Sequence, residues 1–308
     1  MGVVLAVDGG NSKTELVVAT TNGDVLARTR GPGSNSHAVG ADGAAHVIRE
    51  LAGGVAADIG VYYLCGADVP ADIAELEDEL AGLAARTIVD NDTCAILRAG
   101  TEAPDAVAIV CGSGINCVGR SADGHVARYP SLGWETGDCG GGEQLGRDAI
   151  FHAARAEDGR GSATALAPAI RAHFGALSVE AVGADFHYRR LAVVRLNEIA
   201  PLVVDAAAHG DEVARLLVGR LADEIVLMVR RALADLAVAR ADVVLGGGLL
   251  QDRERPLLAE LVRERLPEGC RAVVLEAPPV LGAVLAALDV AGAGDDAKRR
   301  VRTELDGR

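Results

Sequence analysis

The stretch of sequence that decides the fold is Val3-Val4-Leu5-Ala6-Val7-Asp8-Gly9-Gly10-Asn11-Ser12-Lys13-Thr14, close to the start of the chain. An apolar run ends there in a small polar turn, and a second apolar run, Leu16-Val17-Val18-Ala19, follows at once. This pattern predicts a strand, a tight turn and a strand. The turn is suited to wrapping backbone N–H groups around a phosphate, because glycine has no Cβ to keep the anion away. Many ordinary hairpins share the pattern, so one such turn is weak evidence.

The same unit occurs twice in the chain. After the first hairpin, Asn22-Gly23 predicts a type I′ turn, and Val25 to Arg28 completes a three-stranded antiparallel meander. A second strand–turn–strand–turn–strand unit runs from Ala106 to Arg128, with Gly112-Ser113-Gly114-Ile115-Asn116 as its first turn. We interpret the pair as an internal duplication, in which each copy offers a turn of phosphate size.

The remaining pattern alternates helices and strands. Strands are predicted over 59–64, 87–89, 242–245 and 273–275, and helices over 44–57, 70–83, 191–208, 211–236, 255–266 and 280–288. A short helix is expected from Thr93. The tail from Gly292 shows no apolar period, so we expect it to be disordered and assign it no function.

Length and composition narrow the classes of protein. The 308 residues are enough for two domains, and 50% apolar and 24% charged residues are typical of a globular protein. The net charge of −14 argues against a nucleic-acid partner, which requires a basic face. The sequence contains no run of about 18 consecutive apolar residues, so no membrane span is expected. The N-terminus also lacks the basic segment followed by an apolar one that marks a secretory signal, so we expect a cytoplasmic protein. The six cysteines form no CxxC pair and are expected to be reduced, packed thiols.

Several separated segments resemble the motifs of the actin-like ATPase superfamily of sugar kinases, actin and heat-shock ATPases. Asp8 to Thr14 resembles its first phosphate loop, Gly112-Ser113-Gly114 its second and Gly246-Gly247-Gly248 its adenosine motif. Within that group the chain most resembles the N-acetylglucosamine kinase branch, the BadF/BadG/BcrA/BcrD ATPase family. The resemblance covers nearly the whole chain and is carried further by Val89-Asp90-Asn91-Asp92, Gly112 to Cys117, Gly133 to Gly142 and Leu145-Gly146-Arg147.

The resemblance implies an α/β fold of two duplicated actin-like (ribonuclease H-like) domains with a nucleotide and sugar cleft between them. The expected N-terminal domain comprises residues 1–105 plus 282–294. The C-terminal domain, with a helical insertion, comprises residues 106–281, and residues 295–308 form the disordered tail.

The implied activity is ATP-dependent phosphorylation of an amino sugar or related hexose, N-acetylglucosamine or glucosamine-like, at the 6-hydroxyl. Such a transfer needs neutralised phosphates and a base for the hydroxyl proton. Asp92 stands at a strand end and matches the family's base, with Asp90 as its rival; a helix N-cap is the structural alternative for Asp92. Asp8 is suited to holding Mg²⁺. ATP is expected to contact Gly9, Gly10, Asn11, Ser12, Lys13, Thr14, Gly112, Ser113, Gly114, Gly246, Gly247 and Gly248.

The sugar contacts that the resemblance implies are polar residues in short loops. They are Asn35, Gly66, Asp92, Asn116 and Asp138. Amide and carboxylate groups are able to grip vicinal hydroxyls, although turn chemistry alone also explains Asn35. Two departures affect the choice of sugar: no aromatic residue stands near His37, and Cys139 replaces the acidic neighbour of Asp138.

Two other functions stay open. One is an ATPase activator subunit of a dehydratase or reductase system, since some relatives drive electron transfer and hold an iron–sulfur cluster. Cys94 lies close to Asp92, but the glycine-rich cysteine segment of that subgroup is missing after it. The other is a sugar-sensing regulator, which would need a DNA-binding module that we do not expect here. A homodimer is expected, as in many relatives.

Overall fold

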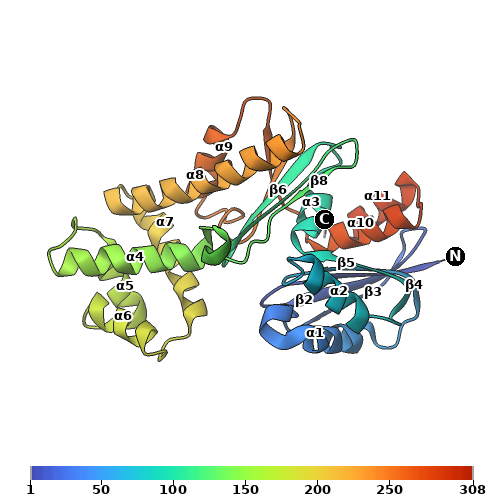
Figure 1. The fold of residues 1–308 in the computed structure, drawn as a ribbon, viewed down its shortest axis with the longest axis horizontal. Coiled ribbons are helices and arrows are strands. Elements are labelled where there is room, and N and C mark those ends of the chain that lie inside the picture. Colours follow the sequence, from blue (N-terminus) through green and yellow to red (C-terminus); the bar gives the residue numbers. More distant parts are fainter. Residues whose placement is uncertain (1, 307–308) are drawn as a thin grey trace. The chain divides into compact units, whose positions relative to one another are not determined.

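The computed structural model describes residues 2–306 and divides the chain into two compact units (Figure 1). Unit 1 comprises residues 1–108 and 275–308, and unit 2 comprises residues 109–274. The domain boundaries expected from the sequence, at 105/106 and 281/282, stay a prediction. Among the described residues, no helix combines the length and the apolar character that a membrane span requires.

Unit 1 is built on a mixed sheet of five strands in the order β3-β2-β1-β4-β5. The strands are β1 (Val3–Gly9), β2 (Thr14–Thr20), β3 (Val25–Gly31), β4 (Ala57–Leu64) and β5 (Ala84–Asn91). The first three form the predicted antiparallel meander, while β1 pairs in parallel with β4 and β4 with β5. The carboxyl ends of β1, β4 and β5 therefore meet at one edge of this sheet.

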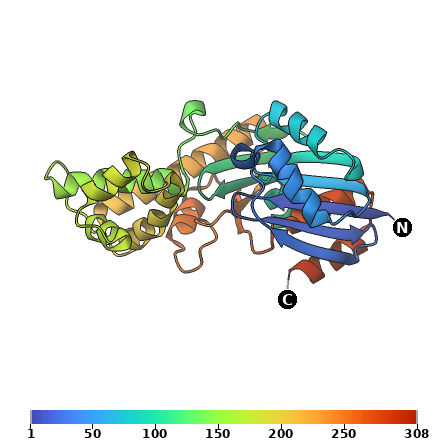
Figure 2. The ribbon, with the colours of Figure 1, turned by 90° about the horizontal axis from the view of Figure 1, so that it is seen from below.

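Both faces of this sheet are covered, because side chains alternate along each strand. Leu5 and Val7 pack toward one core cluster, whereas Val4 and Ala6 pack toward the other. The first cluster is shared with α1 (Ser36–Ala52) and α2 (Pro70–Glu79), and the second with α10 (Val280–Val290) and α11 (Asp295–Leu305); α3 (Thr93–Gly100) packs on α10. Figures 1 and 2 show these helices on the two sides of the strands.

Unit 2 repeats the strand order of unit 1. Its strands are β6 (Ala106–Cys111), β7 (Ile115–Arg120), β8 (Val126–Arg128), β9 (Asp242–Gly246) and β10 (Arg271–Val274). They lie in the order β8-β7-β6-β9-β10, so the third, second, first, fourth and fifth strands are neighbours in both units. This identity of topology confirms the predicted duplication and the two-domain α/β fold.

Most of unit 2 beyond its sheet is helical. Its helices are α4 (Gly141–Glu157), α5 (Leu166–Phe174), α6 (Val179–His187), α7 (Ala200–Ala208), α8 (Glu212–Asp235) and α9 (Leu257–Arg265), with 3₁₀ turns η1 (Trp134–Thr136) and η2 (Val193–Ile199). The single helix predicted over 191–208 is wrong, since η2 precedes α7 there. Pro201 lies in the first turn of α7 and has no N–H to continue a helix through it.

The prediction of a disordered tail over 295–308 is wrong for its described part, and residues 307–308 lie outside the described residues. Residues 295–305 form α11, and three of its side chains, Ala297, Val301 and Leu305, are buried. Lys298 pairs with Asp289 of α10, and Arg302 pairs with Glu102 after α3. The helix is stable because its apolar stripe covers the same face of the sheet as α10.

Gly282 marks the closest approach of two helices in unit 1. A Cβ at this position would lie 1.9 Å from the carbonyl oxygen of Ala95 in α3. Gly282→Ala is expected to destabilise the protein by about 1–3 kcal/mol, because α3 and α10 must move apart. Urea denaturation measures this change. Gly183→Ala in α6 is the matched control: its Cβ would meet only the Ile150 side chain, at 3.9 Å, so a gain of about 0.5–1 kcal/mol is expected. Equal effects of the two variants would contradict the packing argument.

Candidate active site

The candidate site in unit 1 lies where the parallel strands end. The strand register places Gly9 beside Leu64 and Leu64 beside Asn91, so the ends of β1, β4 and β5 form one row. Asp8 comes just before this row and Asp92 just after it. Open α/β sheets bind ligands beyond the carboxyl ends of their strands. The structure thus brings the first phosphate turn and the candidate base to the same sheet edge.

The first phosphate turn is closed by its own backbone. Gly10 N–H donates to the carbonyl oxygen of Lys13 at 2.9 Å. A Cβ on Gly9 would lie 2.3 Å from Ser34 Oγ, so this glycine is required by packing. Asn11 and Ser12 are exposed at the tip. Thr14 is fully buried and donates its hydroxyl to Ser34 at 2.8 Å, which gives its side chain a role in holding the turn.

Asn35 lies against the same turn, and Gly66 lies against Asn35 and the start of α1. Asn35 is the N-cap of α1, with Oδ1 accepting from His37 N–H at 2.9 Å, and its amide donates to Asn11 Oδ1. Gly66 has φ +89°, and a Cβ there would collide with Ser36 Oγ at 2.3 Å. The turn chemistry considered for Asn35 is therefore realised, and it fixes the side chain beside the phosphate turn.

Asp8 has the environment of a cation ligand. It is partly buried at the end of β1, and burial, followed by the carboxylates of Asp92 and Glu15, raises its pKa to about 8. Carboxylates that repel one another in a protein interior fit a bound cation, which offsets the repulsion. Oxygen ligands are those that Mg²⁺ prefers. The residues present thus fit a magnesium ion at Asp8.

Asp92 is placed at the first turn of α3 but does not cap it. It occupies the N-cap position without a capping hydrogen bond from its side chain. Asn91 Oδ1 accepts from Thr93 N–H instead, at 2.9 Å. Burial, and then the charge of Asp68, raise the pKa of Asp92 to about 7. Backbone N–H groups of Thr93 and of Asp92 itself lower this pKa in part. A carboxylate with this proton affinity is suited to accepting a proton near neutral pH.

The second phosphate turn lies at the start of α4 in unit 2. Gly142 N–H donates to Gly112 O at 2.8 Å, and Glu143 N–H donates to Ser113 O at 3.0 Å. Added Cβ atoms on Gly112 and Gly114 would meet nothing within 4 Å. Packing does not require these two glycines, so the open space beside them fits an approaching phosphate.

Asn116 and Asp138 lie near this turn in unit 2. Asn116 Oδ1 accepts from Ser131 Oγ at 2.7 Å, and Asp138 accepts from Thr136 Oγ1. Asp138 lines a pocket of ≈ 710 Å³ together with Ser113 and Trp134. The pocket is large enough for a monosaccharide. Asp138 thus lines a hollow next to the second glycine turn, and Ser131, the partner of Asn116, lines the same hollow.

The glycines after β9 have two different roles. Gly247 has φ +87°, and a Cβ on it would lie 2.5 Å from the carbonyl oxygen of Cys111, so its conformation and packing both require glycine. Gly248 would meet nothing within 4 Å, while Gly246 ends the strand. Gly248 therefore leaves open space of the kind expected beside a nucleoside.

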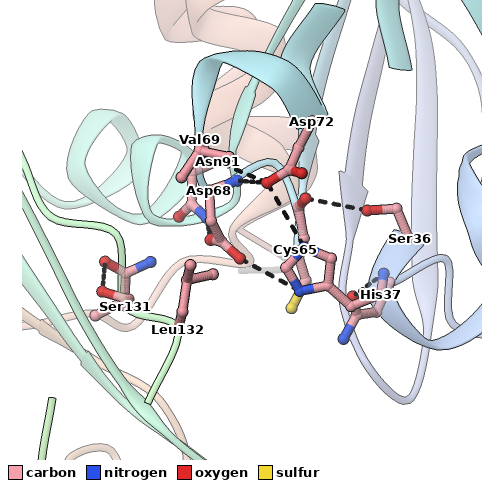
Figure 3. Close-up of polar contacts among 12 residues, drawn as sticks. Ser36, His37, Cys65, Asp68, Val69, Asp72, Asn91, Ser131 and Leu132 are labelled. Atoms are coloured by element: carbon pink, nitrogen blue, oxygen red, sulfur yellow. Dashed lines mark hydrogen bonds and ion pairs between the residues drawn. The ribbon is translucent and has the colours of Figure 1, made fainter. Parts of the chain in front are cut away.

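Sequence reasoning missed a polar cluster beside Asp92 (Figure 3). Asn91 Nδ2 donates to Asp68 Oδ1 at 2.6 Å. The ring of His37 lies between two carboxylates, with Nδ1 3.7 Å from Asp68 Oδ2 and Nε2 3.6 Å from Asp72 Oδ2. The signals were available, since Asp68 ends the run after β4 and Asn91 ends β5. Their contact depends on strand pairing, which the sequence does not state.

The chain is similar in sequence and in fold to several known proteins. An N-acetyl-D-glucosamine kinase of Dictyostelium discoideum is 26% identical over 314 residues, covering 93% of this chain and 98% of that protein. An N-acetylmuramic acid/N-acetylglucosamine kinase of Clostridium acetobutylicum is 30% identical over 269 residues, covering 82% and 87%. The fold matches a candidate N-acetylglucosamine kinase of Chromobacterium violaceum with a TM-score of 0.71 at 23% identity, covering 92% and 98%.

The family predicted from the motifs is confirmed by a match that spans most of both units. The family model describes ATPases, so membership implies ATP binding. Residues 5–287 match that model, and the chain belongs to the BadF/BadG/BcrA/BcrD ATPase family.

Proposed function

We propose that this protein is an ATP-dependent kinase that phosphorylates an amino sugar or a related hexose, N-acetylglucosamine or glucosamine-like, at the 6-hydroxyl. The observation that carries the proposal is the row at the carboxyl ends of β1, β4 and β5, which joins the first phosphate turn to Asp92. The names of the relatives from Dictyostelium discoideum and Clostridium acetobutylicum support the acceptor class.

The proposed roles follow from the chemistry of each residue. Asp92 takes the proton of the acceptor hydroxyl as the oxygen attacks the γ-phosphorus of ATP, and ADP leaves. Asn35, Gly66, Asn116 and Asp138 orient the sugar. The backbone of the two glycine turns binds the phosphates. Asp8 would hold Mg²⁺, which supplies positive charge to the phosphate oxygens.

The pH dependence of the reaction should follow the proposed base. Asp92 accepts a proton only when it is ionised, and its pKa is raised to about 7. The kcat/KM for the sugar is therefore expected to rise with pH through neutrality and to level off in mildly alkaline buffer, since kcat/KM reports the groups of the free enzyme. Initial rates between pH 5 and 9 measure this. A flat profile across that range would contradict the assignment.

A panel of sugars tests the function itself. We expect ADP release to depend on an added hexose or amino sugar and a sugar 6-phosphate to appear in equal amount, measured by a coupled ADP assay and by mass spectrometry of the product. The alternative, an ATPase that drives an electron-transfer partner, predicts ATP hydrolysis without sugar and iron in the purified protein. Sugar-independent turnover with no phosphorylated sugar would overturn the kinase proposal.

A further inference from the structure

We propose that Asp68 is a positioning residue that orients Asp92 through Asn91 and connects it, through His37, to the loop that carries Asn35. This inference rests on the proposed function, in which Asp92 is the base. None of the motifs that carry the family resemblance includes Asp68.

The amide of Asn91 can adopt only one orientation. Asp68 is acceptor-only when ionised, so the nitrogen end of Asn91 must face it, at 2.6 Å. The oxygen end then accepts from Thr93 N–H, at 2.9 Å, and from the Thr93 hydroxyl. Asn91 is 7% exposed, so water does not compete for these bonds. The loop after β4 is thus joined to the first turn of α3, where Asp92 stands.

Asp68 also reaches the opposite side of the site. Its second carboxylate oxygen lies 3.7 Å from His37 Nδ1, and the side chain of Asp68 is only 12% exposed. The opposite charge of a protonated His37 would stabilise this carboxylate. His37 N–H is capped by Asn35, whose side chain contacts the phosphate turn at Asn11. One carboxylate therefore touches both the base segment and the expected sugar loop (Figure 3).

The contact of Asp68 with Asn91 and its contact with His37 should affect different kinetic constants. Asp68→Ala removes both and is expected to lower kcat by about 10–100-fold, the usual cost of a small misplacement of a reacting group, and to raise KM for the sugar. His37→Ala removes only the contact to the sugar loop, so KM should rise while kcat stays within about threefold. Asp72→Asn is the matched control, because it removes the other charge beside His37 and does not touch Asn91. Asp72 also accepts from Asp68 N–H at 3.2 Å and from Val69 N–H at 3.0 Å, and the oxygen of asparagine keeps an acceptor for these bonds, so kcat should stay within about twofold.

A polarity swap tests the hydrogen bond directly. Asn91→Asp places two carboxylates in contact and should lower kcat. Combining it with Asp68→Asn restores a donor and an acceptor, because the new amide at position 68 donates to the new carboxylate at position 91, which still accepts from Thr93. The double variant is expected to recover kcat to within about fivefold of wild type at pH 8.5, where Asp92 is ionised. Its denaturation midpoint should also shift less than the sum of the two single shifts.

The possible results are distinguishable. If the wild type phosphorylates no sugar, the proposed function fails, and this inference with it. If the wild type is active but Asp68→Ala keeps kcat within twofold, or the double variant is no faster than Asn91→Asp, the positioning role is overturned while the kinase proposal stands. If the double variant recovers the denaturation midpoint but not kcat, the bond between positions 68 and 91 is purely structural. That result also overturns the positioning role.

Discussion

Replacing Asp92 by asparagine is expected to lower kcat for sugar phosphorylation by about 10²–10⁴-fold, the usual contribution of a general base. The asparagine has nearly the same volume but does not accept the hydroxyl proton. The fold should be unaffected, because Asn91 and not Asp92 caps the first turn of α3. Steady-state kinetics measures the loss, and a thermal melt with and without sugar shows whether folding and sugar binding are kept.

Asp90 provides the control for this prediction. It is the rival carboxylate two residues earlier, and it accepts from Asn91 N–H at 2.7 Å. Asp90→Asn keeps an acceptor for that bond and is expected to change kcat by less than about fivefold. If Asp90→Asn were the more damaging substitution, or if Asp92→Asn kept a tenth of the activity, Asp92 would not be the base.

The sequence was sufficient for the features that depend on neighbouring residues. The strands of the two meanders were predicted because β-branched runs and small polar turns are local signals. The comparison of two such units within one chain then revealed the duplication, which the shared strand order confirms. The two glycine turns and the strand-end carboxylates were located in the same way, since each lies within a few residues of a strand end, and their roles stay predictions.

Contacts between distant segments could not be predicted. The bond between Asp68 and Asn91 exists because β4 and β5 pair in parallel with Leu64 beside Asn91. The burial of Thr14 depends on Ser34, twenty residues further along the chain. The prediction of one helix over 191–208 was wrong for a different reason. The apolar composition of that segment was given more weight than the missing N–H of Pro201.

The C-terminal helix shows a signal that was present but weak. Ala297, Val301 and Leu305 are spaced by four residues and so lie on one face of a helix. Because charged residues occupy most of the positions between them, the apolar period is hard to recognise in the sequence. Its burial against α10 decides the structure, because a short helix in water gains most of its stability from tertiary packing.

Substitution of Val301 by aspartate is therefore expected to destabilise the protein strongly. Val301 is 0% exposed in the cluster formed with α10 and the sheet. A carboxylate there must be buried without a partner or must push α11 off the sheet and expose apolar surface, and either result costs about 3–5 kcal/mol. The midpoint and slope of urea denaturation measure the loss.

Thr303→Asp adds the same charge to the exposed side of the same helix and is the matched control. Thr303 is exposed, so a change below about 1 kcal/mol is expected there, including the unfavourable position of a negative charge near the helix C-terminus. If α11 did not pack on the sheet, the two substitutions would change the free energy of unfolding by the same amount. The difference between the two variants thus measures how firmly the last helix closes one face of the sheet, whose central strand β1 carries Asp8 and whose edge strand β5 leads into Asp92. Equal midpoints would contradict the packing of α11.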